Sequence, residues 1–360
     1  MDKVRHQLML PETAPRGRGV RIAVLDTGVD PDHPDLAAAV DHSSSKSLSP
    51  LSTDIVDRCY HGTHVSGIIA GSGASSDGRY RGIAPEAGLT VLKISTNGSG
   101  TEGDAVAGVE AAIQAGVDIL NYSNGYSPKT VGHAPWVWPT TSSALEVVLE
   151  LATKAGILCV VAAGNDGPHE GSINRPGGLE CVLTVGATGD DGVLECSSRG
   201  PYWTLDTLPR GKVRRLDTEV DHAALQRPKP DLVAPGELIV APRASDGVLV
   251  KSADLLNPMD PACKYIKVTG ASQSTAVMTG IAACLLDLVR QHGINLGANP
   301  GFALKSLLVF GARRLAKGGR NDFGAGVLKW PMLAATVEDF VTDKNFRQIV
   351  LEGPKLQVVR

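Results

Sequence analysis

Short apolar runs alternate with longer helix-like segments along most of the chain. The runs predict buried strands at 20–25, 89–94, 117–121, 157–163 and 181–185, and the longer segments predict helices at 102–115, 143–155 and 276–288. Strands that alternate with helices in this way indicate βαβ units and a mainly parallel sheet with helices on both faces. The pattern therefore predicts an α/β fold of three layers.

The 360 residues suffice for one large domain, which the pattern places at 20–338. Residues 1–19 precede the first strand and are predicted as an N-terminal extension, and the more charged residues 339–360 as a C-terminal tail. Residues 126–143, which contain two tryptophans and three prolines, are predicted as a surface insertion.

Composition excludes some classes of partner. Apolar residues make up 42% of the chain, charged residues 20%, and the net charge is −3, which gives no basis for a nucleic-acid or anionic-membrane partner. No apolar run approaches the roughly 18 residues that span a bilayer. The six cysteines are scattered without a CxxC pair, which favours a reducing cytoplasm over a disulfide or zinc scaffold.

Polar residues follow several of the apolar segments. Asp26 ends the first predicted strand, where open α/β sheets place functional groups, and Ser272 lies between a strand-like stretch and a long apolar helix. A serine at a helix start can use free backbone N–H groups and the helix dipole to stabilise an anion. Taken alone, Asp26 could equally be a turn residue and Ser272 a helix cap.

Two histidines, His61 and His64, lie three residues apart in a predicted small-residue helix at 61–71. No glutamate follows in an HExxH arrangement, so the pair does not predict a zinc site. One of the two is expected to be a packing histidine.

The chain offers Asp, His and Ser in that order, in three separate segments. A serine hydroxyl is a weak nucleophile unless an imidazole removes its proton, and the imidazole needs a carboxylate to hold its tautomer. This order is the one found in subtilisin, and the absence of Gly-x-Ser-x-Gly around Ser272 argues against an α/β-hydrolase.

Over about residues 20–335 the chain resembles the subtilisin (subtilase) family of serine proteases. The resemblance lies in the sequences IAVLDTG at 22–28, HGTHVSG at 61–67, AAGN at 162–165 and GAS at 270–272. It implies a subtilisin-like fold, with Asp26 orienting His61, His61 as general base, Ser272 as nucleophile and Asn165 as a donor to the oxyanion.

The resemblance also implies two peptide-binding edges, one at Gly98, Ser99 and Gly100 and the other at Ser123, Asn124 and Gly125. An extended polypeptide would bind between them as an added strand. Here Asn124 stands where an apolar residue is common, and Gln273-Ser274-Thr275-Ala276-Val277 follows Ser272 where the family has Met-Ala-Thr-Pro-His. These departures affect substrate preference more than activity.

Two further expectations come from the family. The short apolar segment 7–11 could lie in the cleft as an inhibitory segment, as in intracellular subtilisins. Asp35 and the loop 73–81 correspond to a region where many members bind a stabilising calcium ion, although few carboxylates are present here. No cofactor is expected to be required.

Three functional hypotheses follow. The leading one is a cytoplasmic serine endopeptidase that hydrolyses polypeptides through an acyl-enzyme. A second keeps the acyl-enzyme but lets an amine displace it, which would make a peptide ligase or macrocyclase. The third is a peptide-binding pseudoprotease, which the presence of all four catalytic residue types disfavours.

Overall fold

A ten-stranded sheet forms the centre of the protein in the computed structural model, which describes residues 1–96, 98, 100–127, 142–203, 226–247 and 263–353. The main path of the sheet runs in the order β13 (Ala312–Arg313), β14 (Val327–Leu328), β10 (Leu232–Pro235), β6 (Leu183–Gly189), β5 (Leu158–Ala162), β4 (Ile119–Tyr122), β1 (Arg21–Asp26), β3 (Gly88–Lys93) and β2 (Lys46–Ser47). All neighbours on this path are parallel except β13 and β14, and β7 (Gly192–Val193) pairs antiparallel with β6.

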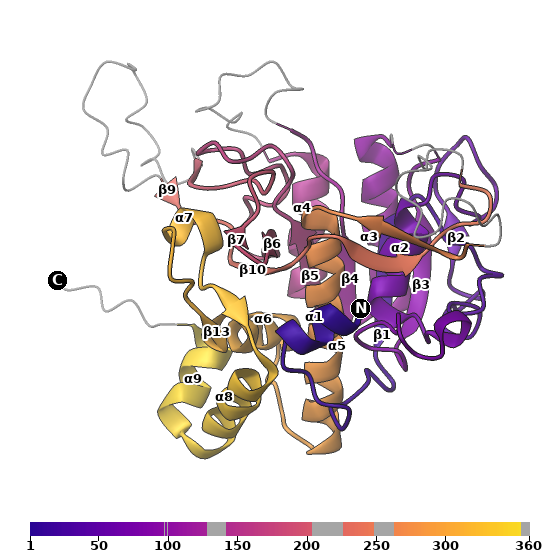
Figure 1. Ribbon diagram of the computed structural model, residues 1–360. Coiled ribbons are helices and arrows are strands. Elements are labelled where there is room, and N and C mark those ends of the chain that lie inside the picture. The colour runs from indigo at the N-terminus through magenta and orange to yellow at the C-terminus, as the bar shows by residue number, and fades with distance from the viewer. Residues whose placement is uncertain (97, 99, 128–141, 204–225, 248–262, 354–360) are drawn as a thin grey trace, which may run out of the picture.

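Helices cover both faces of this sheet (Figure 1). One face carries α2 (His61–Ala70) and α5 (Ala271–Gln291), extended by α1 (Asp2–Gln7), α6 (Pro300–Phe310), α8 (Trp330–Thr342) and α9 (Lys344–Glu352). The other face carries α3 (Glu102–Ala115) and α4 (Ala144–Lys154). The remaining elements are η1 (Ala74–Ser76), α7 (Arg320–Phe323) and two small antiparallel pairs, β11 (Ile239–Pro242) with β12 (Tyr265–Val268) and β8 (Tyr202–Trp203) with β9 (Gln226–Arg227). The predicted three-layer α/β fold is confirmed.

Local sequence explains where the helices on the α3–α4 face begin. Thr101 and Asp104 form a capping box at the start of α3, and Ser143 and Glu146 form another at the start of α4. Gly116 ends α3 in the left-handed conformation, at φ 61°, which a residue without a Cβ adopts at little cost. These signals place both helices close to their predicted bounds.

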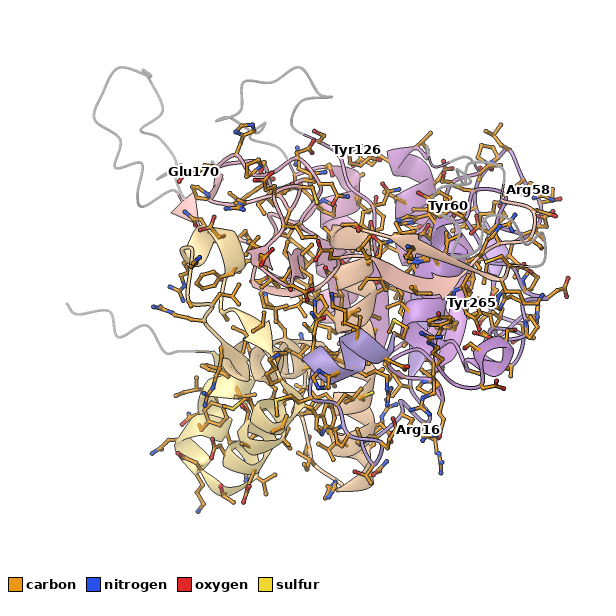
Figure 2. The ribbon with its side chains drawn as sticks, viewed as in Figure 1. Arg16, Arg58, Tyr60, Tyr126, Glu170 and Tyr265 are labelled. Carbon is orange, nitrogen blue, oxygen red and sulfur yellow. The ribbon has the colours of Figure 1, made fainter. Side chains whose placement is uncertain are left out.

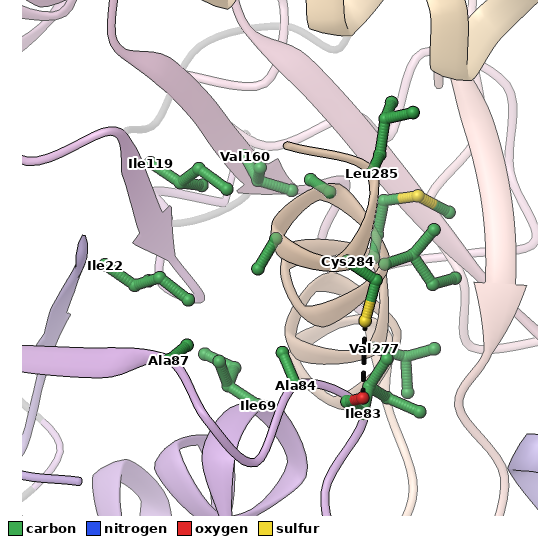
Figure 3. Close-up of a cluster of buried hydrophobic side chains, with 14 of the residues drawn as sticks. Ile22, Ile69, Ile83, Ala84, Ala87, Ile119, Val160, Val277, Cys284 and Leu285 are labelled. Atoms are coloured by element: carbon green, nitrogen blue, oxygen red, sulfur yellow. Dashed lines mark hydrogen bonds between the residues drawn. The ribbon is translucent and has the colours of Figure 1, made fainter. Parts of the chain in front are cut away.

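The helix α5 is the central packing element. Its side chains face Ile22, Ile119 and Val160 of three neighbouring strands, and the Sγ of Cys284 lies 3.4 Å from the carbonyl oxygen of Ile83 (Figure 3). By length and hydropathy α5 is the one described helix that could cross a membrane, but 94% of its most apolar window is buried inside the fold. Its composition is therefore that of a core helix.

Both ends of the chain differ from expectation. The boundary predicted at residue 338 falls inside α8, and residues 344–352 form α9, whose Val350 is fully buried. At the other end Val4, Leu8 and Leu10 are buried in the same core cluster as α5. The sequence pattern missed both because each helix buries only a few apolar residues, too few to give a clear periodicity.

The packing of the C-terminal helices predicts that substituting two adjacent residues of α8 will destabilise the protein to different extents. Phe340 is 1% exposed and Val341 is 43% exposed. We expect Phe340→Ala to lower the free energy of unfolding by about 3–5 kcal/mol, because it removes a buried aromatic side chain and leaves a cavity. Val341→Ala is the matched control and should change it by less than about 1 kcal/mol.

Urea unfolding of the two variants beside the wild type measures the difference. Equal, small losses of stability in both variants would mean that α8 does not belong to the folded core.

Candidate active site

The first candidate residue, Asp26, lies at the carboxyl end of β1 and is 3% exposed. Its strand lies between β3 and β4, so Asp26 belongs to a central strand of the sheet. It is therefore close to the residues that follow β4. The carboxyl ends of parallel strands are where α/β sheets gather functional groups. The position agrees with the sequence prediction.

His61 is the first residue of α2, and its Nδ1 lies 2.7 Å from Oδ1 of Asp26. An ionised carboxylate only accepts hydrogen bonds, so Nδ1 carries the proton and donates it, which leaves Nε2 free to act as a base. The same Oδ1 accepts a hydrogen bond from the backbone N–H of Thr27, at 2.7 Å. The side chain of His61 is 23% exposed, which leaves the ring accessible to a substrate.

Four effects set the pKa of His61. Burial pulls the pKa down, but the negative charge of Asp26 and its hydrogen bond, with a smaller contribution from Asp57, together raise the pKa above the ordinary 6.5. The imidazolium that forms when His61 accepts a proton is therefore stabilised.

Asp57 joins the segments that contain Asp26 and His61, and sequence reasoning did not single it out. It is fully buried and accepts five hydrogen bonds. These come from the N–H groups of Cys59, Tyr60 and Thr63 and from the hydroxyls of Thr27 and Thr63. The carboxylate thus fastens the start of α2, with His61, to the loop after Asp26. The one sequence signal that could have identified it is its position four residues before His61.

The second histidine, His64, is a buried packing residue. Its Nε2 donates to the carbonyl oxygen of Ile239 at 3.1 Å, and its Nδ1 lies 3.5 Å from Nε2 of Gln273. Burial, together with the nearby charge of His61, lowers its pKa to about 3. His64 is therefore neutral, and among the described residues no group of three or more His, Cys, Asp and Glu could hold a metal ion.

Ser272 lies in the first turn of α5 and is 8% exposed. The sequence prediction had the helix beginning at residue 276, but it begins at Ala271, so the serine is part of the helix. First-turn N–H groups have no carbonyl partner inside a helix, which leaves them available to an anion. The hydroxyl of Ser272 donates to the carbonyl oxygen of Ser123 at 3.0 Å.

Asn165 follows β5 and faces the same helix start. Its Oδ1 accepts a hydrogen bond from the backbone N–H of Ala271 at 2.9 Å. This contact occupies the oxygen of the amide and leaves its NH₂ group for another acceptor. A Cβ on Gly270 would lie 3.2 Å from that Oδ1, so the absence of a side chain there gives the amide room.

One pocket of about 550 Å³ brings these groups together. It is lined by 15 residues: Asp26, Thr27, Cys59, Tyr60, His61, Gly98, Ser123, Asn124, Gly125, Ala162, Gly164, Asn165, Asp166, Asn174 and Ser272. The four predicted catalytic residues, and four of the six predicted substrate-binding residues, are among them.

A second pocket of about 180 Å³ lies next to the first and shares Gly98, Asn124 and Gly125 with it. Gly100 lines this smaller pocket, and Ser99 lies outside the described residues. Tyr60 lines the larger pocket and Tyr126 the smaller one (Figure 2). Asn174, which sequence reasoning also missed, lies directly beside Gly125 in the lining of the larger pocket, since a Cβ added to Gly125 would come 3.1 Å from the Cβ of Asn174.

The N-terminal segment does not lie in this pocket, so the prediction of an inhibitory segment at 7–11 is wrong for this structure. Leu8 and Leu10 are buried in the α5 core, and the N–H of Trp330 donates to the carbonyl oxygen of Leu8 at 2.8 Å. Figure 1 shows α1 beside α5. The segment therefore acts here as part of the core.

In the region expected to bind calcium, the Asp35 carboxylate accepts hydrogen bonds from other protein groups. Oδ1 of Asp35 accepts from the N–H of Ser75 at 2.8 Å, and Oδ2 accepts from the hydroxyl of Tyr265, labelled in Figure 2, also at 2.8 Å. Calcium requires six to eight oxygen ligands, and both oxygens of this carboxylate already have donors. The residues present do not fit a calcium site.

Comparisons with known proteins agree with this geometry. The sequence model of the subtilase family matches residues 17–326. The serine protease AprX of Bacillus subtilis is 33% identical over 87% of this chain and 65% of its own length. An intracellular serine protease of Paenibacillus polymyxa is 29% identical over 76% of this chain and 68% of its own.

Among solved structures, the protease domain of PatA matches with a TM-score of 0.64 at 24% identity, over 91% of this chain and 98% of that domain. That likeness supports the fold. The chain spans less than two thirds of the length of AprX and under half of several other curated relatives.

The contact between His61 and Asp26 predicts the pH dependence of any reaction that uses His61 as a base. The base must be neutral, so the rate should fall as the pH falls through the His61 pKa, which lies above 6.5. In Asp26→Asn the acid limb should move to lower pH, because the charge that stabilises the imidazolium is gone. The rate should also drop by about 10⁴-fold because the amide favours the wrong tautomer.

The measurement is the pH profile of kcat/KM for both proteins. Asp287→Asn is the matched control, because Asp287 is also a buried carboxylate but accepts backbone N–H groups of residues 16–18 instead. An acid limb that stays in place in Asp26→Asn would contradict the assigned pairing.

Proposed function

Because the chain belongs to the subtilase family, we propose that it is a serine endopeptidase that cleaves polypeptides through an acyl-enzyme. One observation carries the proposal. The His61–Asp26 pair, at 2.7 Å, lines the same pocket as Ser272 at a helix start and Asn165, whose amide NH₂ has no acceptor among the described residues. Acyl transfer needs a nucleophile, a base, an orienting carboxylate and an oxyanion donor, and this pocket contains each residue type.

In the proposed reaction the hydroxyl of Ser272 turns from the carbonyl of Ser123 toward Nε2 of His61 and attacks the scissile carbonyl carbon. His61 takes the proton and then gives it to the leaving amine. The oxyanion accepts hydrogen bonds from Nδ2 of Asn165 and from the backbone N–H of Ser272. Water, activated by His61, then hydrolyses the acyl-enzyme and restores the serine.

The substrate is proposed to bind as an extended strand between the segment at 98–100 and the segment at 123–125. Glycines at three of these six positions leave backbone N–H and C=O groups accessible to a substrate backbone. Asn124 adjoins both pockets, so the side-chain pockets for the substrate are more polar there than an apolar residue would make them. No cofactor is part of the proposal, because side chains and backbone groups supply every step.

The ligase and pseudoprotease hypotheses share this pocket. The side chain of His61 is 23% exposed, so water can reach the acyl-enzyme. This favours water over an amine as the acceptor of the acyl group. Aminolysis would need an amine bound beside His61, and no observation favours such a site. The pseudoprotease hypothesis is disfavoured because none of the four residue types is missing.

For location we propose the cytoplasm. All six cysteines are free thiols, three of them buried, which suits a reducing compartment. The relatives include proteins named intracellular and one named extracellular, so they support either location.

Asn165 provides the sharpest kinetic prediction of the proposal. In Asn165→Ala we expect kcat to fall by about 10²–10³-fold, the range known for the corresponding kind of asparagine in subtilisin. KM should stay within about threefold, because the amide binds charge that develops only in the transition state. The assay is cleavage of a mixture of unstructured peptides, followed by mass spectrometry.

Asn345→Ala, on the exposed surface of α9, is the control. Each product pair should gain the mass of one water, whereas joined or cyclised products would support the ligase. Peptides left intact by the wild type would contradict the endopeptidase proposal.

A further inference from the structure

Ser272 and Ser123 are joined by two reciprocal hydrogen bonds. The hydroxyl of Ser272 donates to the carbonyl oxygen of Ser123 at 3.0 Å, and the hydroxyl of Ser123 donates to the carbonyl oxygen of Ser272 at 3.2 Å. The first residue lies on α5 and the second follows β4. The pair therefore fixes both the resting direction of the nucleophile's hydroxyl and the place of its backbone.

A buried line of side chains supports this pair from behind. Nδ2 of Asn121 donates to Oγ of Ser123 at 3.0 Å, and Oγ1 of Thr279 donates to Oδ1 of Asn121 at 2.9 Å. Asn121 and Thr279 are both fully buried. The line runs from the third turn of α5, through β4, and back to the first turn of the same helix.

The directions of these bonds are mutually dependent. Because the hydroxyl of Thr279 donates to the amide oxygen of Asn121, the amide NH₂ of Asn121 is directed toward Ser123. Oγ of Ser123 accepts that bond, so its own proton is left to donate to the carbonyl of Ser272. Hydrogen bonds linked in this way strengthen one another in a buried setting.

We propose that Thr279, acting through Asn121 and Ser123, is a positioning residue for the nucleophile Ser272. It lines neither of the two pockets described above, so it does not touch a substrate bound there. It determines instead how tightly the hydroxyl of Ser272 is held in the position from which it turns toward His61. The proposal rests on the endopeptidase function proposed above.

The same helix contains a control residue. Thr275 is also fully buried and also donates one hydrogen bond, but to the carbonyl oxygen of Ala271 in its own helix, at 2.7 Å. Thr275→Val and Thr279→Val therefore remove the same hydroxyl from the same kind of environment. Only the second change reaches the Ser123–Ser272 pair.

The experiment compares Thr279→Val, Thr279→Ser and Thr275→Val with the wild type. Measurements are kcat and KM for one cleaved peptide, corrected for the active fraction, the rate of labelling by a fluorophosphonate, and Tm. We expect Thr279→Val to lower kcat and the labelling rate by about 3- to 10-fold, with KM within about twofold, because a misplaced reacting group slows turnover more than binding. Thr279→Ser should restore most of the loss, and Thr275→Val should keep kcat within about twofold.

Wild-type rates in Thr279→Val, or equal losses in both valine variants, would overturn the positioning role. A lower Tm with unchanged kcat per active site would also overturn it, since the role would then be structural. A wild type that is labelled but cleaves no peptide overturns the endopeptidase function, and the labelling rates then decide the positioning role. A wild type that is neither labelled nor active overturns both.

Discussion

The buried contact between Asp26 and His61 is the interaction on which the rest of the site depends. A carboxylate that is 3% exposed is costly to bury unless it is paired and hydrogen-bonded. Here one oxygen of Asp26 meets the imidazole and the N–H of Thr27, while the other has no partner among the described residues. The hydrogen bond from the imidazole therefore stabilises the buried carboxylate. The same bond holds the imidazole in the tautomer that leaves Nε2 free.

The fold supplies the rigidity that this contact needs. Asp26 ends a strand in the interior of the sheet, and His61 begins a helix packed on that sheet. Asp57 ties the two together with five hydrogen bonds. The long helix α5 then brings Ser272 to the same edge and anchors it in the core through 21 largely buried residues. The geometry of the candidate site therefore depends on three elements, β1, α2 and α5, that cannot move independently without exposing apolar surface.

The sequence contained enough to predict the fold and the main residues of the site, but not the contacts between them. The strand end at Asp26, the place of Ser123 just after a strand, and the start of α2 at His61 followed from short apolar runs and from motif resemblance. The roles of Asp57, Asn121 and Thr279 did not follow, because each also depends on one partner 30 or more residues away, a distance that no local pattern encodes. The N-terminal segment was misjudged for a similar reason, since Leu8 and Leu10 are buried by elements at the far end of the chain.

The most direct test of this account is the intact mass of the protein after incubation with a fluorophosphonate, for the wild type and for Ser272→Ala. The account predicts one covalent adduct on the wild type and none on the variant, because only a serine activated by His61 reacts with such a probe. Heat-unfolded wild type should also remain unlabelled. No adduct on the folded wild type, or an adduct that persists in Ser272→Ala, would contradict the assignment of Ser272, His61 and Asp26 as a working triad.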